Sequence, residues 1–191
     1  MLGLNTEDLE EMRHVMTHNM NMNTSNQLKN TELHIMSLYN KYYDVDFLLK
    51  NGANVDEQNI MGITPLYYAS YWGNYDIVKL LLENGANVNI KSIYNMTPLH
   101  GACIMGFLNV IELLLKYGAN IEGTNSIGDT PIMIAQKRNN NDVILCLERE
   151  VNVKHDIKKR LYVMSLVIQR DVFKHFFIEK HSRKIRHNYM P

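Results

Sequence analysis

Apolar residues in the middle of the chain recur in blocks, and the blocks repeat every 33 residues. The clearest block is Val78 with Leu80–Leu82, which is matched by Ile111 with Leu113–Leu115. Apolar positions spaced in this way indicate a helix with one buried face. A shorter apolar block begins after Thr64 and again after Thr97. Each 33-residue unit is therefore predicted to contain two helices.

Rare residues mark the same period and predict where the first helix of each unit begins. A threonine side chain can cap free backbone N–H groups, and proline is well suited to the first helical position. A small side chain inside that helix lets a neighbouring helix approach closely. The threonines are Thr31, Thr64, Thr97 and Thr130, the prolines are Pro65, Pro98 and Pro131, and the alanines are Ala69, Ala102 and Ala135.

Glycines predict where the helices end. Gly73 and Gly106 follow the first helix of their units, and Gly85 and Gly118 follow the second helix. We expect Gly85 and Gly118 to adopt a left-handed backbone conformation. The turn before each first helix has Gly62 or Gly128, with Asn95 at the equivalent position. Asparagine tolerates a positive φ better than most residues.

The segments Thr97-Pro98-Leu99-His100-Gly101-Ala102 and Leu80-Leu81-Leu82-Glu83-Asn84-Gly85-Ala86 resemble the ankyrin repeat, and the resemblance extends over about residues 26–153. It implies an all-α solenoid of stacked helix-turn-helix units joined by β-hairpin loops. His100 lies at the histidine position of the family, where the side chain joins the hairpin to the helix by hydrogen bonds. The predicted repeats are residues 26–58, 59–91, 92–124 and 125–153.

Both ends of the chain are expected to cap the stack. The segment Glu10–Asn23 aligns without a gap onto Asp76–Asn89, so residues 1–25 are interpreted as a capping half repeat. Residues 154–191 form a basic segment, in which Tyr162–Ile168 and Val172–Ile178 are expected to be two helices of a degenerate capping repeat. An unrelated helical tail is the alternative.

Composition narrows the functional classes. The 191 residues are 46% hydrophobic and carry 20 Lys and Arg against 20 Asp and Glu, so the chain is not a polycation. The longest nearly unbroken apolar run, Leu161–Ile168, is too short to span a bilayer. The N-terminal sequence lacks the pattern of a secretory signal. Two cysteines, Cys103 and Cys146, are expected to be reduced and packed, as in an intracellular protein of the cytoplasm.

No catalytic or cofactor motif is recognisable, and we expect a non-enzymatic protein without a cofactor. His14 and His18 are four residues apart, but no third ligand accompanies them, so no metal site is predicted.

The family resemblance places the binding surface on the hairpin tips and on the exposed side of the first helices. Several of these positions are apolar, which is typical of a site for a partner protein. We expect a monomer that binds an unidentified protein, with Tyr71, Trp72 and Tyr94 as anchors. The full predicted set is Ile60, Met61, Ile63, Tyr71, Trp72, Ile93, Tyr94, Met96, Ile104, Met105, Ile127, Lys137 and Arg138.

Charge is divided unevenly along the chain, with a net −7 over residues 1–153 and +7 over residues 154–191. The basic runs Lys158–Arg160 and Lys180–Arg186 are interpreted as a solvated surface, and a nuclear-import signal or a nucleic-acid contact is the alternative.

A compositional bias toward Asn, Ile, Tyr and Met, together with the resemblance, suggests a poxvirus or intracellular bacterium whose protein acts on host proteins in the host cytoplasm. Two rival hypotheses are a decoy that resembles inhibitors of Rel-type transcription factors and a nucleic-acid-binding accessory protein that uses the basic segment.

Overall fold

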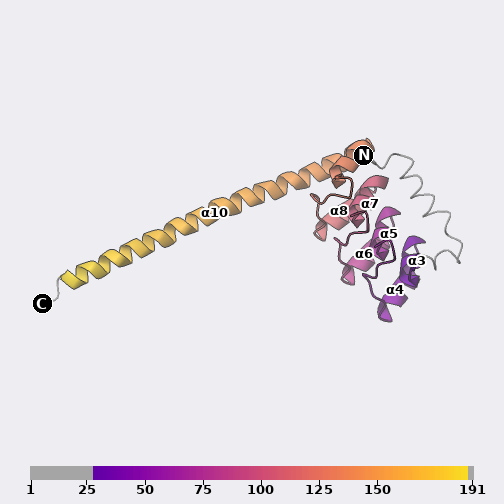
Figure 1. Cartoon of the computed structure of the whole chain (residues 1–191), viewed down its shortest axis with the longest axis horizontal. Helices are drawn as coiled ribbons and strands as arrows, with labels where there is room; N and C mark the ends of the chain where they lie inside the picture. Colours follow the sequence, from indigo (N-terminus) through magenta and orange to yellow (C-terminus); the bar gives the residue numbers. More distant parts are fainter. Residues whose placement is uncertain (1–27, 189–191) are drawn as a thin grey trace. The chain divides into compact units, whose positions relative to one another are not determined.

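The computed structural model describes residues 28–188, and the chain divides into two compact units, residues 1–148 and 149–191. In the described part of the first unit, helices follow one another in antiparallel pairs (Figure 1). The pairs are α3 (Glu32–Leu38) with α4 (Tyr42–Lys50), α5 (Pro65–Tyr71) with α6 (Tyr75–Glu83), α7 (Pro98–Met105) with α8 (Leu108–Lys116), and α9 (Pro131–Lys137) with the start of α10 (Asn141–Asn188). Residues 28–188 contain helices and no strand, which confirms the all-α class.

The first helix of each repeat begins directly after a threonine, as the sequence predicts. The hydroxyl of Thr64 accepts a hydrogen bond from the backbone N–H of Tyr67 at 3.2 Å, and Thr130 makes the equivalent bond. Proline occupies the first turn of α5, α7 and α9. Capping and a preset φ angle together fix where each short helix starts.

Positive φ angles recur at equivalent positions of successive 33-residue repeats. Gly85 and Gly118 have φ angles of 86° and 85°, so the predicted left-handed helix ends are confirmed. Asn95, with φ 55°, also adopts the left-handed conformation that Gly62 and Gly128 adopt. Because few residues other than glycine and asparagine tolerate this region, the composition of these positions follows from the backbone geometry.

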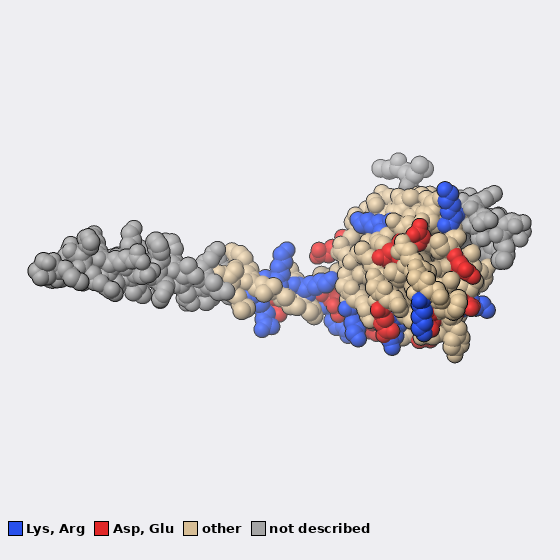
Figure 2. Space-filling model, turned by 90° about the horizontal axis from the view of Figure 1, so that it is seen from below, with Lys and Arg blue, Asp and Glu red and all other residues tan. Residues whose placement is uncertain are grey.

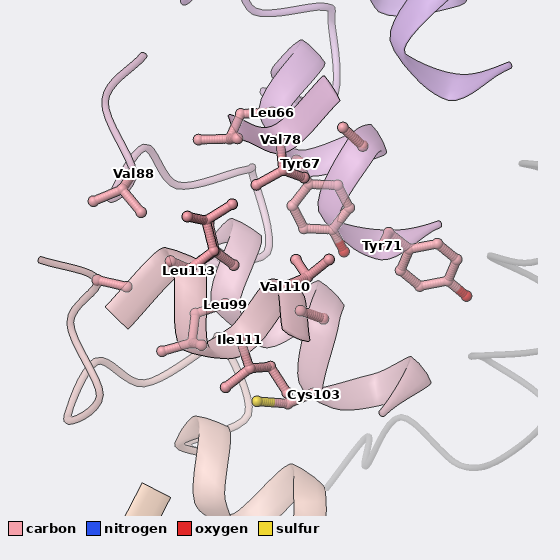
Figure 3. Close-up of a cluster of buried hydrophobic side chains, with 14 of the residues drawn as sticks. Leu66, Tyr67, Tyr71, Val78, Val88, Leu99, Cys103, Val110, Ile111 and Leu113 are labelled. Atoms are coloured by element: carbon pink, nitrogen blue, oxygen red, sulfur yellow. The ribbon is translucent and has the colours of Figure 1, made fainter. Parts of the chain in front are cut away.

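The core lies between successive helix pairs. Ala69, Ala102 and Ala135 are fully buried, as expected for residues at close helix contacts. Figure 3 shows Leu66 and Val78 in one cluster with residues of the following pair, among them Val110 and Leu113. Each pair therefore buries its apolar face against its neighbours, as in other solenoids.

The second unit differs from the prediction for residues 154–191. A single helix, α10, extends over Asn141–Asn188, so the expectation of two helices at Tyr162–Ile168 and Val172–Ile178 is wrong. Residues 141–188 contain no glycine or proline, and the sequence therefore offers no local signal for a helix end. A capping role for this segment stays a prediction. The predicted half repeat at residues 1–25 and the pair His14 and His18 lie outside the described residues.

Candidate protein-binding surface

Three hairpin turns, at residues 59–63, 92–96 and 125–129, precede the first helices α5, α7 and α9. In the first turn, the backbone N–H of Asn59 donates to the carbonyl of Ile63 at 3.0 Å. The side-chain oxygen of Asn59 also accepts hydrogen bonds from the N–H groups of Met61 and Ile63, at 2.9 and 3.0 Å. Ser92 and Asn125 have the same role in the other two turns. One buried polar residue therefore fixes the shape of each turn.

Backbone hydrogen bonds also join each hairpin turn to the one before it. The N–H of Ile93 donates to the carbonyl of Met61 at 3.0 Å, and the N–H of Ser126 donates to the carbonyl of Tyr94 at 2.9 Å. The N–H of Ile60 makes the equivalent bond to the carbonyl of Leu28 at 3.0 Å. These bonds hold the three turns in a row at the edge of the stack.

Apolar side chains lie exposed along this edge. Ile60 is 51% exposed and Ile93 is 55% exposed, while the values for Tyr94 and Ile127 are 38% and 36%. We call these four residues the tip row. Their backbone is held both by a side chain within the turn and by the neighbouring turn, so little conformational entropy remains to be lost when a partner binds.

Four residues of the predicted binding set are not accessible. Ile63, Tyr71, Met96 and Ile104 are each less than 9% exposed, so the expectation that they form part of an exposed surface is wrong. Ile63 and Met96 directly precede the capping threonines, and their side chains enter the core. The ring of Tyr71 stacks on that of Tyr67, with 6.3 Å between ring centroids.

The remaining apolar members of the set are half-buried. Met61, Trp72 and Met105 each pack against the core cluster. The Trp72 indole also meets the Tyr71 ring edge-to-face, at 5.5 Å between ring centroids. Of the three proposed anchors, Tyr94 is therefore the one that lies in the tip row.

The fourth repeat has exposed charged residues at two positions where the second and third repeats have buried or half-buried apolar residues. Lys137 and Arg138 are exposed, as predicted, and the Lys137 ammonium lies 2.6 Å from the carboxylate of Asp129. Asp129 occupies the position of Ile63 and Met96 in the other turns. The tip row therefore ends at a repeat whose first helix exposes Lys137 together with one apolar side chain, Met133, which is 45% exposed.

Family models for ankyrin repeats match most of the region that forms this stack. One model, described as ankyrin repeats (3 copies), matches residues 3–92, and a second, described as ankyrin repeats (many copies), matches residues 72–115. The chain belongs to the ankyrin-repeat family. Ankyrin repeats are generally modules for protein–protein interaction, and proteins built from them are typically non-enzymatic. A search of curated protein sequences found no match to the chain.

Two histidines have the structural role that the ankyrin resemblance implies for His100. The Nδ1 atom of His100 lies 2.8 Å from the Thr97 hydroxyl, and that of His34 lies 2.7 Å from the Thr31 hydroxyl. His34 Nε2 also lies 2.9 Å from the carbonyl of Ile63 in the next repeat. Burial lowers the pKa of both imidazoles, which favours the neutral form.

Sequence reasoning missed His34, although a signal was present. Thr31-Glu32-Leu33-His34 has the same spacing as Thr97-Pro98-Leu99-His100, with glutamate in place of proline. It also missed the roles of Asn59, Ser92 and Asn125, which are 33 residues apart.

A second exposed group lies at the first described ankyrin repeat. Phe47 is 66% exposed, whereas Leu80 and Leu113, at the equivalent positions, are 9% and 8% exposed. Tyr43, one turn earlier on α4, is 86% exposed. Leu80 and Leu113 each lie in a repeat that follows another described repeat, whereas Phe47 lies in the first described repeat. The interpretation of residues 1–25 as a half repeat predicts that they cover Phe47.

Among the side chains that the structure describes, no group of three or more His, Cys, Asp or Glu is arranged to hold a metal ion. Cys103 and Cys146 are buried, and burial raises the pKa of the Cys103 thiol. No helix among the described residues is both long and apolar enough to cross a membrane.

Replacing Asn59 by alanine is expected to destabilise the ankyrin stack by about 1 to 3 kcal/mol, because two backbone N–H groups lose their acceptor. Thermal unfolding followed by circular dichroism measures this loss. Asn59→Ser is the matched control, since serine has this role at position 92. If both variants melted like the wild type, the turn would not depend on the side chain at position 59.

Proposed function

We propose that the chain binds a partner protein through the tip row and that Ile93 and Tyr94 lie at the centre of the contact. The observation that carries the proposal is the combination of exposed apolar side chains with a backbone fixed by turn-to-turn hydrogen bonds. A partner with a complementary apolar surface would bury these side chains without ordering a flexible loop.

The four side chains of the tip row are uncharged, so the contact that we propose is apolar. On the face of the first unit shown in Figure 2, basic and acidic side chains are interspersed. The net charge of −7 over residues 1–153 would favour the approach of a basic partner without changing the apolar character of the tip row. Specificity would then come from the shape of the tip row, with Lys137 and Arg138 as charged residues in the fourth repeat.

Substituting both central residues, Ile93→Ser with Tyr94→Ser, is expected to weaken partner binding by at least about 2 kcal/mol, which is roughly 30-fold in Kd. Both side chains are exposed, so the melting temperature should change little. The measurement has two steps. Wild-type chain first captures partners from a cell lysate, and the Kd of each purified partner is then measured for both forms.

Leu145→Ser is the matched control, because Leu145 is also apolar and 64% exposed but lies on α10. It should bind the partner like the wild type. Partners that bind all three forms equally would contradict a role for the tip row.

The basic part of α10 supports a second candidate function, nucleic-acid binding. Lys154 and Lys158–Arg160 are all exposed on this helix. Strongly salt-dependent retention on DNA or RNA, lost when the basic residues become glutamine, would support it. An effect on host proteins and a resemblance in function to inhibitors of Rel-type transcription factors stay hypotheses, and binding to a purified Rel-type factor tests the latter.

A further inference from the structure

The second unit presents a stripe of exposed apolar side chains along α10. Val153 is 48% exposed and Ile157 is 50% exposed, while Leu161 and Met164 reach 61% and 60%. Their spacing of four, four and three residues places them within an arc of about 80° around the helix. We call these four residues the stripe. A single helix gains most of its stability from packing such a face, so the stripe is suited to bind another surface.

The sequence pattern of the stripe is the same in both directions. The spacing continues at positions 168 and 172, which are isoleucine and valine, to give steps of 4, 4, 3, 4 and 4 residues. A second copy of the helix can align antiparallel to the first, with the centre of the pair between residues 162 and 163. Position 153 of one copy then lies level with position 172 of the other, 157 with 168, and 161 with 164. Every level then pairs two apolar residues, so the stripe is complementary to itself.

Charge favours the antiparallel direction. In a parallel pair in register, the run Lys158–Arg160 of one copy would lie level with the same run of the other, and like charges would repel. In the antiparallel pair this run lies level with residues 165–167, which are Ser, Leu and Val. Lys154 lies level with Asp171, a residue of opposite charge.

We propose that α10 binds the α10 of a second copy of this chain, antiparallel, through the stripe. The paired region, residues 153–172, is about 30 Å long, as expected for some 20 helical residues. The assembly is then a dimer that contains two ankyrin stacks. A dimer differs from the expectation of a monomer. The proposal is independent of the tip row.

Sedimentation velocity of the full chain over a range of concentrations tests the proposal. The wild type should have the mass of two chains at high concentration. The double variant Ile157→Glu with Leu161→Glu should have the mass of one chain at every concentration, because charge replaces the centre of the stripe. Lys159→Glu is the control. Lys159 lies on the opposite side of the helix, so this variant should retain the mass of two chains.

Cysteine cross-linking tests the direction of the pair. In the antiparallel pair, a Val153→Cys chain mixed with a Val172→Cys chain should form a disulfide-linked product, because the two positions lie level. Neither variant alone should cross-link, since identical positions are then about 28 Å apart along the axis.

Several results would overturn the proposal. They are a wild type with the mass of one chain at all concentrations, a mass of three or more chains, and cross-linking of Val153→Cys with itself. A one-chain wild type that binds vesicles of anionic lipid would assign the stripe to a membrane surface. If the double variant Ile157→Glu with Leu161→Glu instead had a lower Tm but an unchanged mass, the stripe would be assigned to a surface that covers the chain's own repeats.

Discussion

Replacing Leu81 by alanine should lower the free energy of unfolding by about 2 to 5 kcal/mol. Leu81 is fully buried on α6, between the helix pairs that precede and follow it. Its truncation removes apolar contacts and leaves a cavity that the surrounding helices can fill only in part. Because each repeat is stabilised by its neighbours, the loss affects interfaces on both sides.

Chemical denaturation of the wild type and of Leu81→Ala measures this difference. Lys79→Ala, on the exposed side of the same helix, is the control and should change stability by no more than about 0.5 kcal/mol. A loss of the same size in both variants would mean that the assignment of the two faces of α6 is wrong.

Replacing Gly73 by alanine should cost about 2 to 5 kcal/mol in total, for two reasons. Gly73 has φ 72°, a conformation that a residue with a Cβ atom adopts at a cost of about 1 to 2 kcal/mol. In addition, an added Cβ would lie 2.7 Å from the ring of Phe107 in the next repeat. That ring must move, and the resulting overpacking adds about 1 to 3 kcal/mol.

Gly118 provides a matched comparison for this second effect. It has φ 85°, but no atom lies within 4 Å of the position that a Cβ atom would occupy, so Gly118→Ala should cost only about 1 to 2 kcal/mol. Thermal unfolding of both variants separates backbone strain from steric contact. Equal losses would show that the Phe107 ring moves aside without cost.

The sequence predicted the stack well because its signals are local. Threonine caps, glycines with positive φ and buried alanines each depend on a few neighbouring residues, and the 33-residue period repeats the same evidence. The single helix α10 was not predicted, since a pattern of apolar residues in two groups does not by itself show where a helix ends.

The binding surface was predicted less well for a physical reason. Apolar residues at variable positions of the repeat can point outward, as Ile93 does, or into the core, as Met96 does. The two residues belong to the same short turn, and sequence composition gives the same signal for both. The direction depends on the hairpin turn, whose shape is set by the hydrogen bonds of Ser92.

The turn-to-turn hydrogen bonds have a consequence for how such a protein can change in length. Each bond joins a turn only to the one before it, through backbone atoms that every residue type except proline supplies. Duplication of residues 59–91 would therefore reproduce both the donor N–H and the acceptor carbonyl of a turn-to-turn hydrogen bond. The row of turns would become longer by one hairpin turn. Gene duplication within the stack can in this way enlarge the recognition surface while the existing contacts stay in place.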